Sequence, residues 1–325
     1  MVKRRFLQSL IPAVVAPLIL AACNGTDSTG PSPTLVWTSV ASPATQRLYG
    51  VWGSSASDVW AVGFETLIHY DGATWSSPTS VDATGHVFRG VWGTSASNVW
   101  AAGYDYTSGF PAMISHYNGT SWSTVPSGTV NALLGIWGSS ASDVWAVGDA
   151  GAIVHYDGTS WSSVPTVASA ANDYLDAVWG SSRSDVWAAG GTSLYHYNGT
   201  AWSAVSGPGG SHAIWGTSPS DVWAAAGSDT FHYNGSVWSM VPTGRSLPEA
   251  PSSIWGTSPS NVWAVTTSGS PGICCGGTIL HYNGASWSNV MAASALNLTT
   301  VWGSSPSDVW AVGEAGTILH GTPAG

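Results

Sequence analysis

Charged side chains are scarce in this chain of 325 residues, where Asp, Glu, Lys and Arg together make up 7%. The only lysine is Lys3, and after residue 23 four arginines stand against all 17 acidic residues, a formal net charge of −13 for that part of the chain. Such a surface repels phosphate backbones and anionic headgroups. We therefore expect no nucleic-acid partner.

Several motifs of well-known enzymes are also absent. The sequence contains no H-E-x-x-H, no G-x-S-x-G and no Walker-type loop, the patterns typical of zinc proteases, serine hydrolases and nucleotide triphosphatases. We predict no cofactor and no metal site, and we do not expect an enzyme.

Long apolar runs are limited to the N-terminus. Residues 6–22 are apolar, follow three basic residues and are interrupted by Pro12 and Pro17, which is typical of a secretory signal and too short for a spanning helix. Leu-Ala-Ala-Cys at residues 20–23 resembles the lipobox of bacterial lipoproteins, which implies that Cys23 is acylated and attaches the chain to a lipid bilayer. The alternative is an ordinary cleaved signal.

This resemblance defines three expected regions. Residues 1–22 would be a lipoprotein signal peptide, residues 23–33 a flexible tether rich in Gly, Ser, Thr and Pro, and residues 34–325 the folded domain. Asn24 stands where many enterobacterial lipoproteins carry the aspartate that retains them at the inner membrane. We expect the bacterial cell envelope, with the outer membrane or cell surface favoured.

Only three cysteines occur, and the other two, Cys274 and Cys275, are adjacent. If Cys23 carries lipid, these two are left with each other or with another molecule. Adjacent Cα atoms lie about 3.8 Å apart, below the roughly 4.4–6.8 Å usual for a disulfide, so a bond between them would be strained and comparatively easy to reduce. We favour a vicinal disulfide that stiffens its loop.

A repeat occupies nearly all of the remaining sequence. Seven copies follow the pattern V/I-W-G-S/T-S-x-S-D/N-V-W-A, then a variable stretch, then H-Y-N/D-G-x-x-W-S, with spacings of 40, 45, 42, 36, 40 and 47 residues between their first tryptophans. These tryptophans are Trp52, Trp92, Trp137, Trp179, Trp215, Trp255 and Trp302. This period, with several short strand-like runs per unit, predicts an all-β, seven-bladed β-propeller with four strands per blade.

The last copy is incomplete. It stops near His320, before its terminal W-S strand, whereas a matching segment occurs around Trp37 at the other end of the chain. We predict that this N-terminal strand completes blade seven and closes the ring of a monomeric propeller. In the first copy we expect strands at 48–52, 59–62, 66–70 and 74–77. The Asn-Gly and Asp-Gly pairs predict type I′ turns before the fourth strands.

The repeated residues are explained more simply by structure than by function. The 21 tryptophans fall at three recurring positions and are expected to fill the seams between blades, although sugar-stacking platforms are the alternative. Seven histidines, from His69 to His320, recur at one position of the repeat, and seven Asp or Asn residues, from Asp58 to Asp308, recur at a turn position. They resemble the buried Asp-His-Ser/Thr-Trp networks of WD propellers, and we expect structural networks rather than a metal or catalytic array.

The V-W-A-V-G and I-L-H-Y-N-G-x-x-W-S frame resembles bacterial seven-bladed propellers, including tectonin-like and insect-pathogen lectins. Its D/N-G-x-x-W turn also resembles Asp-box propellers. The resemblance implies the fold more than a function: those lectins place sugar sites between blades, the Asp-box class contains both enzymes and inert scaffolds, and no individual contacts can be transferred.

Sequence variation is concentrated on one face of the expected disc. The uniform face carries the nearly invariant turns between strands one and two and between strands three and four. The variable face carries the second-to-third loops and the blade-to-blade connections, where recognition is expected. Three residues before each first tryptophan, at the channel mouth on this face, the type changes from blade to blade. We predict that Tyr49, Arg89, Asp176 and His212 line a polar ligand-binding pocket there, with neutral drift as the alternative.

The sequence therefore predicts a lipid-anchored, exported propeller that binds a glycan or a protein on its variable face. One rival is a carbohydrate-active enzyme, sialidase-like or another glycosidase or lyase, with its site at the channel mouth. Arg47, Arg89 and Arg245 would be a carboxylate clamp in that case, and Asp173 and Asp176 paired carboxylates. The other rival is a structural envelope protein without a specific ligand.

Overall fold

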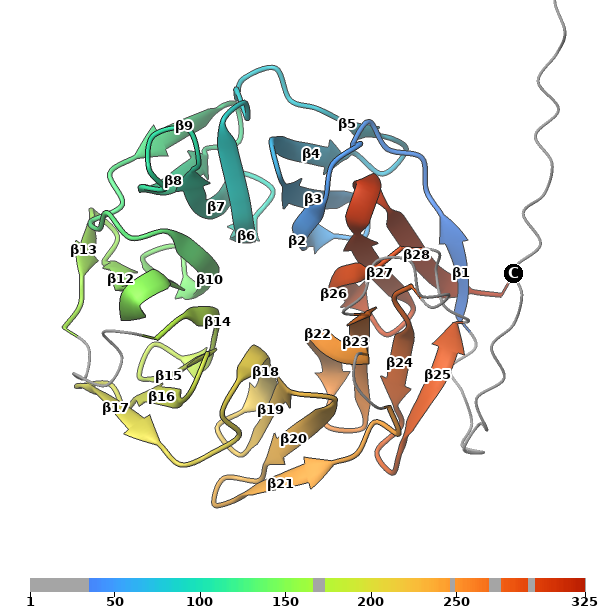
Figure 1. The fold of residues 1–325 in the computed structure, drawn as a ribbon. Helices are drawn as coiled ribbons and strands as arrows, with labels where there is room; N and C mark the ends of the chain where they lie inside the picture. The colour runs from blue at the N-terminus through green and yellow to red at the C-terminus, as the bar shows by residue number, and fades with distance from the viewer. Residues whose placement is uncertain (1–34, 166–172, 246–248, 269–275, 292–295, 325) are drawn as a thin grey trace, which may run out of the picture.

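Seven four-stranded antiparallel sheets form a ring around a central channel (Figure 1). This arrangement comes from a computed structural model, which describes residues 35–165, 173–245, 249–268, 276–291 and 296–324. The predicted seven-bladed propeller is confirmed. The signal peptide, the tether with Cys23, and both Cys274 and Cys275 lie outside the described residues.

Each of blades 1–6 uses four consecutive strands. Blades 1–3 consist of β2 (Leu48–Ser55), β3 (Asp58–Gly63), β4 (Thr66–Tyr70) and β5 (Trp75–Ser76); β6 (His86–Ser95), β7 (Asn98–Asp105), β8 (Ala112–Tyr117) and β9 (Trp122–Val125); and β10 (Leu133–Ser140), β11 (Asp143–Gly148), β12 (Ile153–Tyr156) and β13 (Trp161–Ser163). Blades 4–6 consist of β14 (Leu175–Ser182), β15 (Asp185–Gly190), β16 (Leu194–Tyr197) and β17 (Trp202–Val205); β18 (Ser211–Ser218), β19 (Asp221–Ala226), β20 (Asp229–Tyr233) and β21 (Trp238–Val241); and β22 (Glu249–Ser258), β23 (Asn261–Ser268), β24 (Ile279–Tyr282) and β25 (Trp287–Met291).

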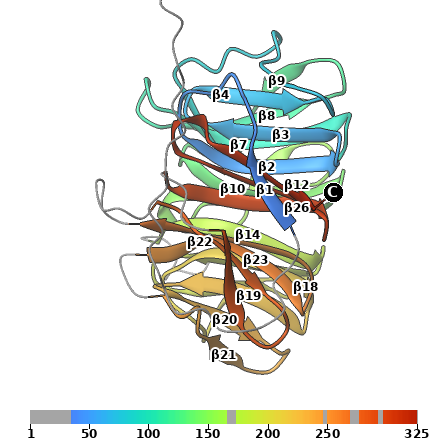
Figure 2. The ribbon, with the colours of Figure 1, turned by 90° about the vertical axis from the view of Figure 1, so that its right-hand side faces the viewer.

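Blade 7 joins the two ends of the chain. It consists of β26 (Leu298–Ser305), β27 (Asp308–Gly313) and β28 (Ile318–Pro323), with β1 (Leu35–Ser39) as its outermost strand. The antiparallel register pairs Leu35 with Pro323 and Trp37 with Gly321. The ring closure predicted from the sequence is therefore confirmed. Figure 2 shows β1 from the outside, on the rim of the disc.

The seams between blades hold the hydrophobic core. In the seam between blades 7 and 1, Leu48, Val51 and Ile68 pack with Trp310 and Ile318, all of them buried. A second-strand indole of one blade meets a fourth-strand indole of the next edge-on, as between Trp60 and Trp122, whose ring centroids lie 5.2 Å apart at 79°. Trp37 makes the equivalent contact with Trp263, at 5.8 Å and 68°. The tryptophans thus act as predicted, because edge-to-face pairs stabilise neighbouring blades beyond their area burial.

The first tryptophan of each blade covers a glycine in the next blade. A Cβ built on Gly93 would lie 2.7 Å from the Cη2 atom of Trp52 and 2.5 Å from the carbonyl oxygen of Asn98. Any side chain at this position would therefore push neighbouring blades apart. The same contact recurs around the whole ring, including Trp302 on Gly53.

The recurring histidines form the expected structural networks. Nε2 of His69 lies 2.6 Å from Oδ1 of Asp58, whose Oδ2 accepts a 2.5 Å hydrogen bond from Ser54 Oγ. The His69 ring also stacks on the Trp60 indole. In blades 2 and 6 the acidic partner is replaced by Asn98 and Asn261, which accept from His116 and His281 at 2.6 Å.

The prediction of type I′ turns is wrong. In the turn after β4 only Gly72 has a positive φ, of 92°, and the preceding aspartate does not. Instead, Oδ1 of Asp71 accepts hydrogen bonds from the backbone N–H groups of Ala73 and Thr74, at 2.9 and 2.8 Å. The carboxylate caps a longer turn, and the Asn residues of other blades do the same through their amide oxygens.

Candidate functional site

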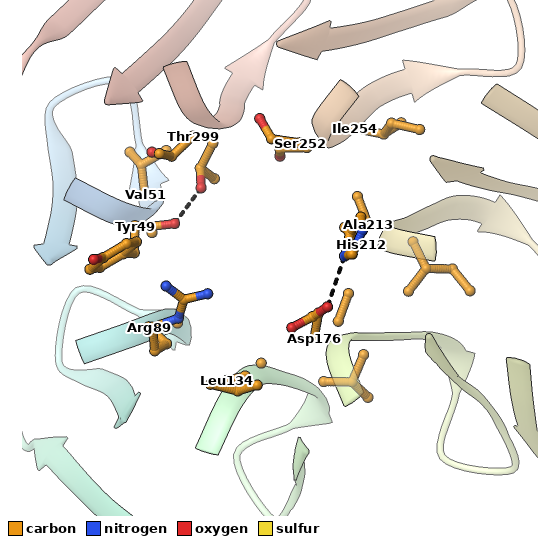
Figure 3. Close-up of a pocket in the computed structure, with 18 of the residues that line it drawn as sticks. Tyr49, Val51, Arg89, Leu134, Asp176, His212, Ala213, Ser252, Ile254 and Thr299 are labelled. Carbon is orange, nitrogen blue, oxygen red and sulfur yellow. Dashed lines mark hydrogen bonds and ion pairs between the residues drawn. The ribbon is translucent and has the colours of Figure 1, made fainter. Parts of the chain in front are cut away.

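A cavity of about 400 Å³ opens at the channel mouth. Its wall is built from the beginnings of the first strands of all seven blades (Figure 3). Because side chains alternate along a strand, Leu48 enters the seam while Tyr49 is half-buried at the channel. The seven variable positions all line this cavity: Tyr49, Arg89, Leu134, Asp176, His212, Ser252 and Thr299.

Two arginines converge on one tyrosine at the cavity wall. The guanidinium carbon of Arg89 lies 4.3 Å from the centre of the Tyr49 ring, and that of Arg47 lies 5.4 Å from it. Arg47 Nη1 also lies 3.9 Å from Glu314 Oε1. Among the described residues, no carboxylate lies within ion-pair distance of Arg89 and no acceptor is hydrogen-bonded to its guanidinium. The aromatic face holds the Arg89 cation in place and leaves its N–H donors uncommitted.

Across the cavity, His212 and Asp176 form a pair. Nδ1 of His212 lies 2.9 Å from Oδ2 of Asp176, and the imidazole is 58% exposed. The hydrogen bond to Asp176 and the negative charge of that carboxylate raise the pKa of His212, while burial opposes the shift. An aspartate on Nδ1 leaves Nε2 exposed to the cavity as a proton acceptor in the neutral ring.

Much of the rest of the wall is either apolar or already hydrogen-bonded. Leu134 supplies an apolar surface, which is half-buried. Ser252 Oγ donates to main-chain carbonyls, with those of Leu298 and Val265 at 3.0 and 3.2 Å. Thr299 Oγ1 lies 2.5 Å from the carbonyl oxygen of Leu48. These hydroxyls join blades 6, 7 and 1 and donate to main-chain carbonyls, in contrast to the guanidinium of Arg89.

Two further groups act on the mouth electrostatically. Burial raises the pKa of Asp149, with Asp176 adding to the shift and Arg89 opposing it. Burial likewise raises the pKa of Tyr104, again opposed by Arg89. Asp149 lies in the turn after β11 and Tyr104 near the end of β7, next to loops whose lengths vary between blades, and nothing in the repeat pattern distinguished them. Sequence analysis therefore missed Asp149 and Tyr104.

The structure separates groups that the enzyme hypothesis would bring together. Asp173 does not line the cavity: it is 4% exposed and accepts hydrogen bonds from Thr192 N, Thr192 Oγ1 and Tyr195 Oη. Arg245 is also not part of the wall, and its Nη1 lies 3.4 Å from Glu249 Oε2. The carboxylate pair and the three-arginine clamp are not assembled at the mouth.

Exposed apolar side chains continue the site across the variable face. Phe110, Val130 and Tyr174 are 56%, 79% and 61% exposed on the β7–β8, β9–β10 and β13–β14 connections of that face. Phe110 has a φ of 66°, unusual for a residue with a side chain. Its ring centroid lies 5.7 Å from that of Tyr104, so aromatic surface extends from the rim toward Arg89.

Comparison with known proteins supports the fold alone. No family model matches the chain, and no curated protein matches it significantly. The structure of YCF48 bound to D1 peptide is 18% identical, with a TM-score of 0.69, and the match covers 91% of this chain and 99% of that one. Streptogramin B lyase is 13% identical, with a TM-score of 0.70, covering 89% and 98%.

An extracellular domain of a putative hybrid two-component system, BT3049 from B. thetaiotaomicron, is 12% identical with a TM-score of 0.69. That match covers 89% of this chain and 42% of the other. These three proteins share the propeller fold although they are proteins of different kinds, as is common for such folds.

Two negative findings apply to the described ranges only. There, no helix has both the length and the apolar character needed to cross a lipid bilayer. Within those ranges, no three His, Cys, Asp or Glu side chains are grouped in a way that would hold a metal ion.

Proposed function

We propose that this chain is an exported, lipid-anchored binding module that takes a peptide segment of another protein at the channel mouth, and that it is not an enzyme. The observation that carries the proposal is the cavity itself. The residues that differ between otherwise repeated blades line its wall. The framework around them is held by the repeated tryptophan and histidine contacts. Concave, largely pre-formed sites with a few oriented polar groups are the usual form of a ligand site.

A peptide is favoured over a glycan by the chemistry around the mouth. Leu134 gives the cavity wall an aliphatic surface, which suits apolar side chains, and Val130 is exposed on the β9–β10 connection of the same face. On that face Phe110 and Tyr174 provide exposed aromatic side chains of the kind that anchor protein interfaces. A propeller neighbour whose structure contains a bound peptide supports the same class of ligand.

The anchor and the site would lie on opposite faces. Leu35 pairs with Pro323, where β28 reaches the uniform face, so β1 begins at that face. A tether ending there, with lipid on Cys23, would hold the disc with its uniform face toward the bilayer. The variable face and the cavity would then point away from the membrane, where a partner can reach them.

The proposal is tested by a peptide selection that compares the native cavity with a cavity filled by a substitution. The full chain carrying Cys23→Ser is immobilised and used to select from a random peptide display library, beside a glycan array. We expect enriched peptides whose binding is lost in Leu134→Trp, which fills the cavity, and kept in Val237→Trp, a matched change on an exposed uniform-face turn. Enrichment that survives Leu134→Trp would contradict the proposal, and glycan binding alone would support the glycan alternative.

A turnover screen tests the enzyme hypothesis against the binding proposal. The Asp176–His212 pair is an arrangement at the mouth that suits a general base. Glycoside and uronide substrates incubated with the wild-type chain should remain intact. Product that depends on His212 would overturn the non-catalytic proposal.

A further inference from the structure

Positive charge is sparse in the part of this chain that follows residue 23. Only four arginines, at positions 47, 89, 183 and 245, follow residue 23, and two of them point at the same tyrosine ring on the cavity wall. Isolated cations in an acidic chain usually pair with nearby carboxylates, as Arg245 does with Glu249. Arg89 does not do so within the described residues. Its guanidinium is instead held by a ring that places no demand on its hydrogen-bond donors.

A guanidinium held in this way is suited to bind a carboxylate. Arginine presents a planar set of N–H donors that matches a carboxylate in a two-point contact. The face of Tyr49 reduces the rotational freedom that Arg89 would otherwise lose on binding, and pre-ordering of this kind strengthens affinity. Arg47 reinforces the positive potential, because Glu314 is 3.9 Å away and offsets it only in part.

Acidic residues on the opposite side of the cavity determine where a negatively charged group of the ligand would lie. Asp176 lies across the mouth from Arg89 (Figure 3), and Asp149 is close enough to both for their charges to influence its titration. A ligand carboxylate placed over blades 3 and 4 would be repelled by these acids. Over blades 1 and 2 it would meet the two arginines and the Tyr49 ring.

We propose that Arg89, supported by Tyr49 and Arg47, is a carboxylate-binding residue, and that the ligand of the channel mouth carries a carboxylate lying over blades 1 and 2. This inference rests on the proposed function for the identity of the ligand as a peptide. An acidic side chain or a chain terminus would supply the group. A uronic acid would supply the same chemistry from a glycan.

The sparse arginine content allows a direct test. Side-chain Nε–H signals of ¹⁵N-labelled full chain carrying Cys23→Ser are followed by NMR while N-acetylglutamate is added, and then its uncharged match N-acetylglutamine. We expect a saturable shift of the Arg89 signal with the carboxylate and none with the carboxamide. A second pair, methyl glucuronide against methyl glucoside, distinguishes the two sources of the carboxylate.

Matched variants complete the experiment. Arg89→Gln should weaken binding of N-acetylglutamate about tenfold or more, the effect expected for a charge-assisted hydrogen bond. Arg183→Gln, the same change on an exposed uniform-face turn, should leave it unchanged. A circular dichroism melt shows whether each variant is folded. Equal response to acid and amide, or equal affinity in Arg89→Gln and wild type, would overturn the inference.

The two proposals fail in different ways. Selected peptides that bind wild type and Arg89→Gln equally, yet are lost in Leu134→Trp, would leave the binding module intact and refute the carboxylate site. A saturable Arg89 shift in a chain that enriches no peptide would support the anion site and refute the peptide proposal.

Discussion

The indole of Trp302 covers the α-carbon of Gly53, so that the last blade is fitted directly against the first. A Cβ on Gly53 would lie 2.7 Å from Cη2 of Trp302 and 2.5 Å from the carbonyl oxygen of Asp58. The same pairing occurs at all seven seams. The ring is therefore closed by a repeated side-chain contact as well as by the strand β1.

Because of this contact, we expect Gly53→Ala to destabilise the folded protein. The added methyl group has no free space, because one of its neighbours is backbone and the other is a ring packed in the seam. We expect the free energy of unfolding to fall by about 1–3 kcal/mol, the range typical of an overpacked core. Urea denaturation measures it, with Ser236→Ala on an exposed turn as the control. An unchanged midpoint for Gly53→Ala would show that the blades adjust freely at this seam.

The contribution of the closing strand is tested within β1 itself. Trp37 packs against Trp263 in the seam between blades 6 and 7, whereas Val36, its neighbour, is 49% exposed. We expect Trp37→Ala to lower the free energy of unfolding by about 2–4 kcal/mol, because it removes a large buried surface. Val36→Ala should cost far less. Equal losses from the two variants would mean that β1 contributes through its backbone pairing alone.

Blade 6 should be sensitive to mild acid. Burial lowers the pKa of His281 to about 4, from about 6.5 in an unfolded chain. Between these pH values the unfolded chain binds a proton that the folded chain does not, so stability is lost as the pH falls from about 6.5 toward 4. His116, whose partner is also an asparagine, has its pKa lowered in the same direction by burial.

Replacing the asparagine partner should reduce this sensitivity. In Asn261→Asp a carboxylate, the kind of partner that five other blades carry, would stabilise protonated His281. We expect the melting temperature of this variant to fall less between pH 7 and pH 5 than that of the wild type. Asn234→Asp, in an exposed turn, is the control for the added charge. A wild-type pH profile in Asn261→Asp would contradict the assignment.

The fold could be predicted because its signals are periodic. Trp52 and Trp60 recur at fixed spacing and pair across the first two strands of blade 1, and the missing fourth strand of blade 7 was evident from the partial repeat that ends at His320. The turn type was predicted wrongly because Asp71 acts through its side chain. Sequence alone indicates an Asp-Gly turn but not whether the backbone or the carboxylate shapes it.

The site was only partly predictable. The variable position identified Tyr49, Arg89, Asp176 and His212, and the structure places all four on the cavity wall; their role in binding stays a prediction. Arg47 stands two residues before Tyr49, and residues at this spacing share a face of an extended segment, but the comparison of one position per blade did not include it. Asp149 follows β11 and Tyr104 lies near the end of β7, next to loops without a repeat, so the repeat pattern could not identify them.

The pairing of β1 with β28 also constrains when the molecule can be completed. Strand β1 precedes the other blades in the chain and β28 follows them, so the ring cannot close until β28 has been synthesised. Until then β1 would lack its partner strand, and blade 1 would lack the seam that it forms with blade 7. Closure of the ring is therefore expected to be a late step in the folding of this domain.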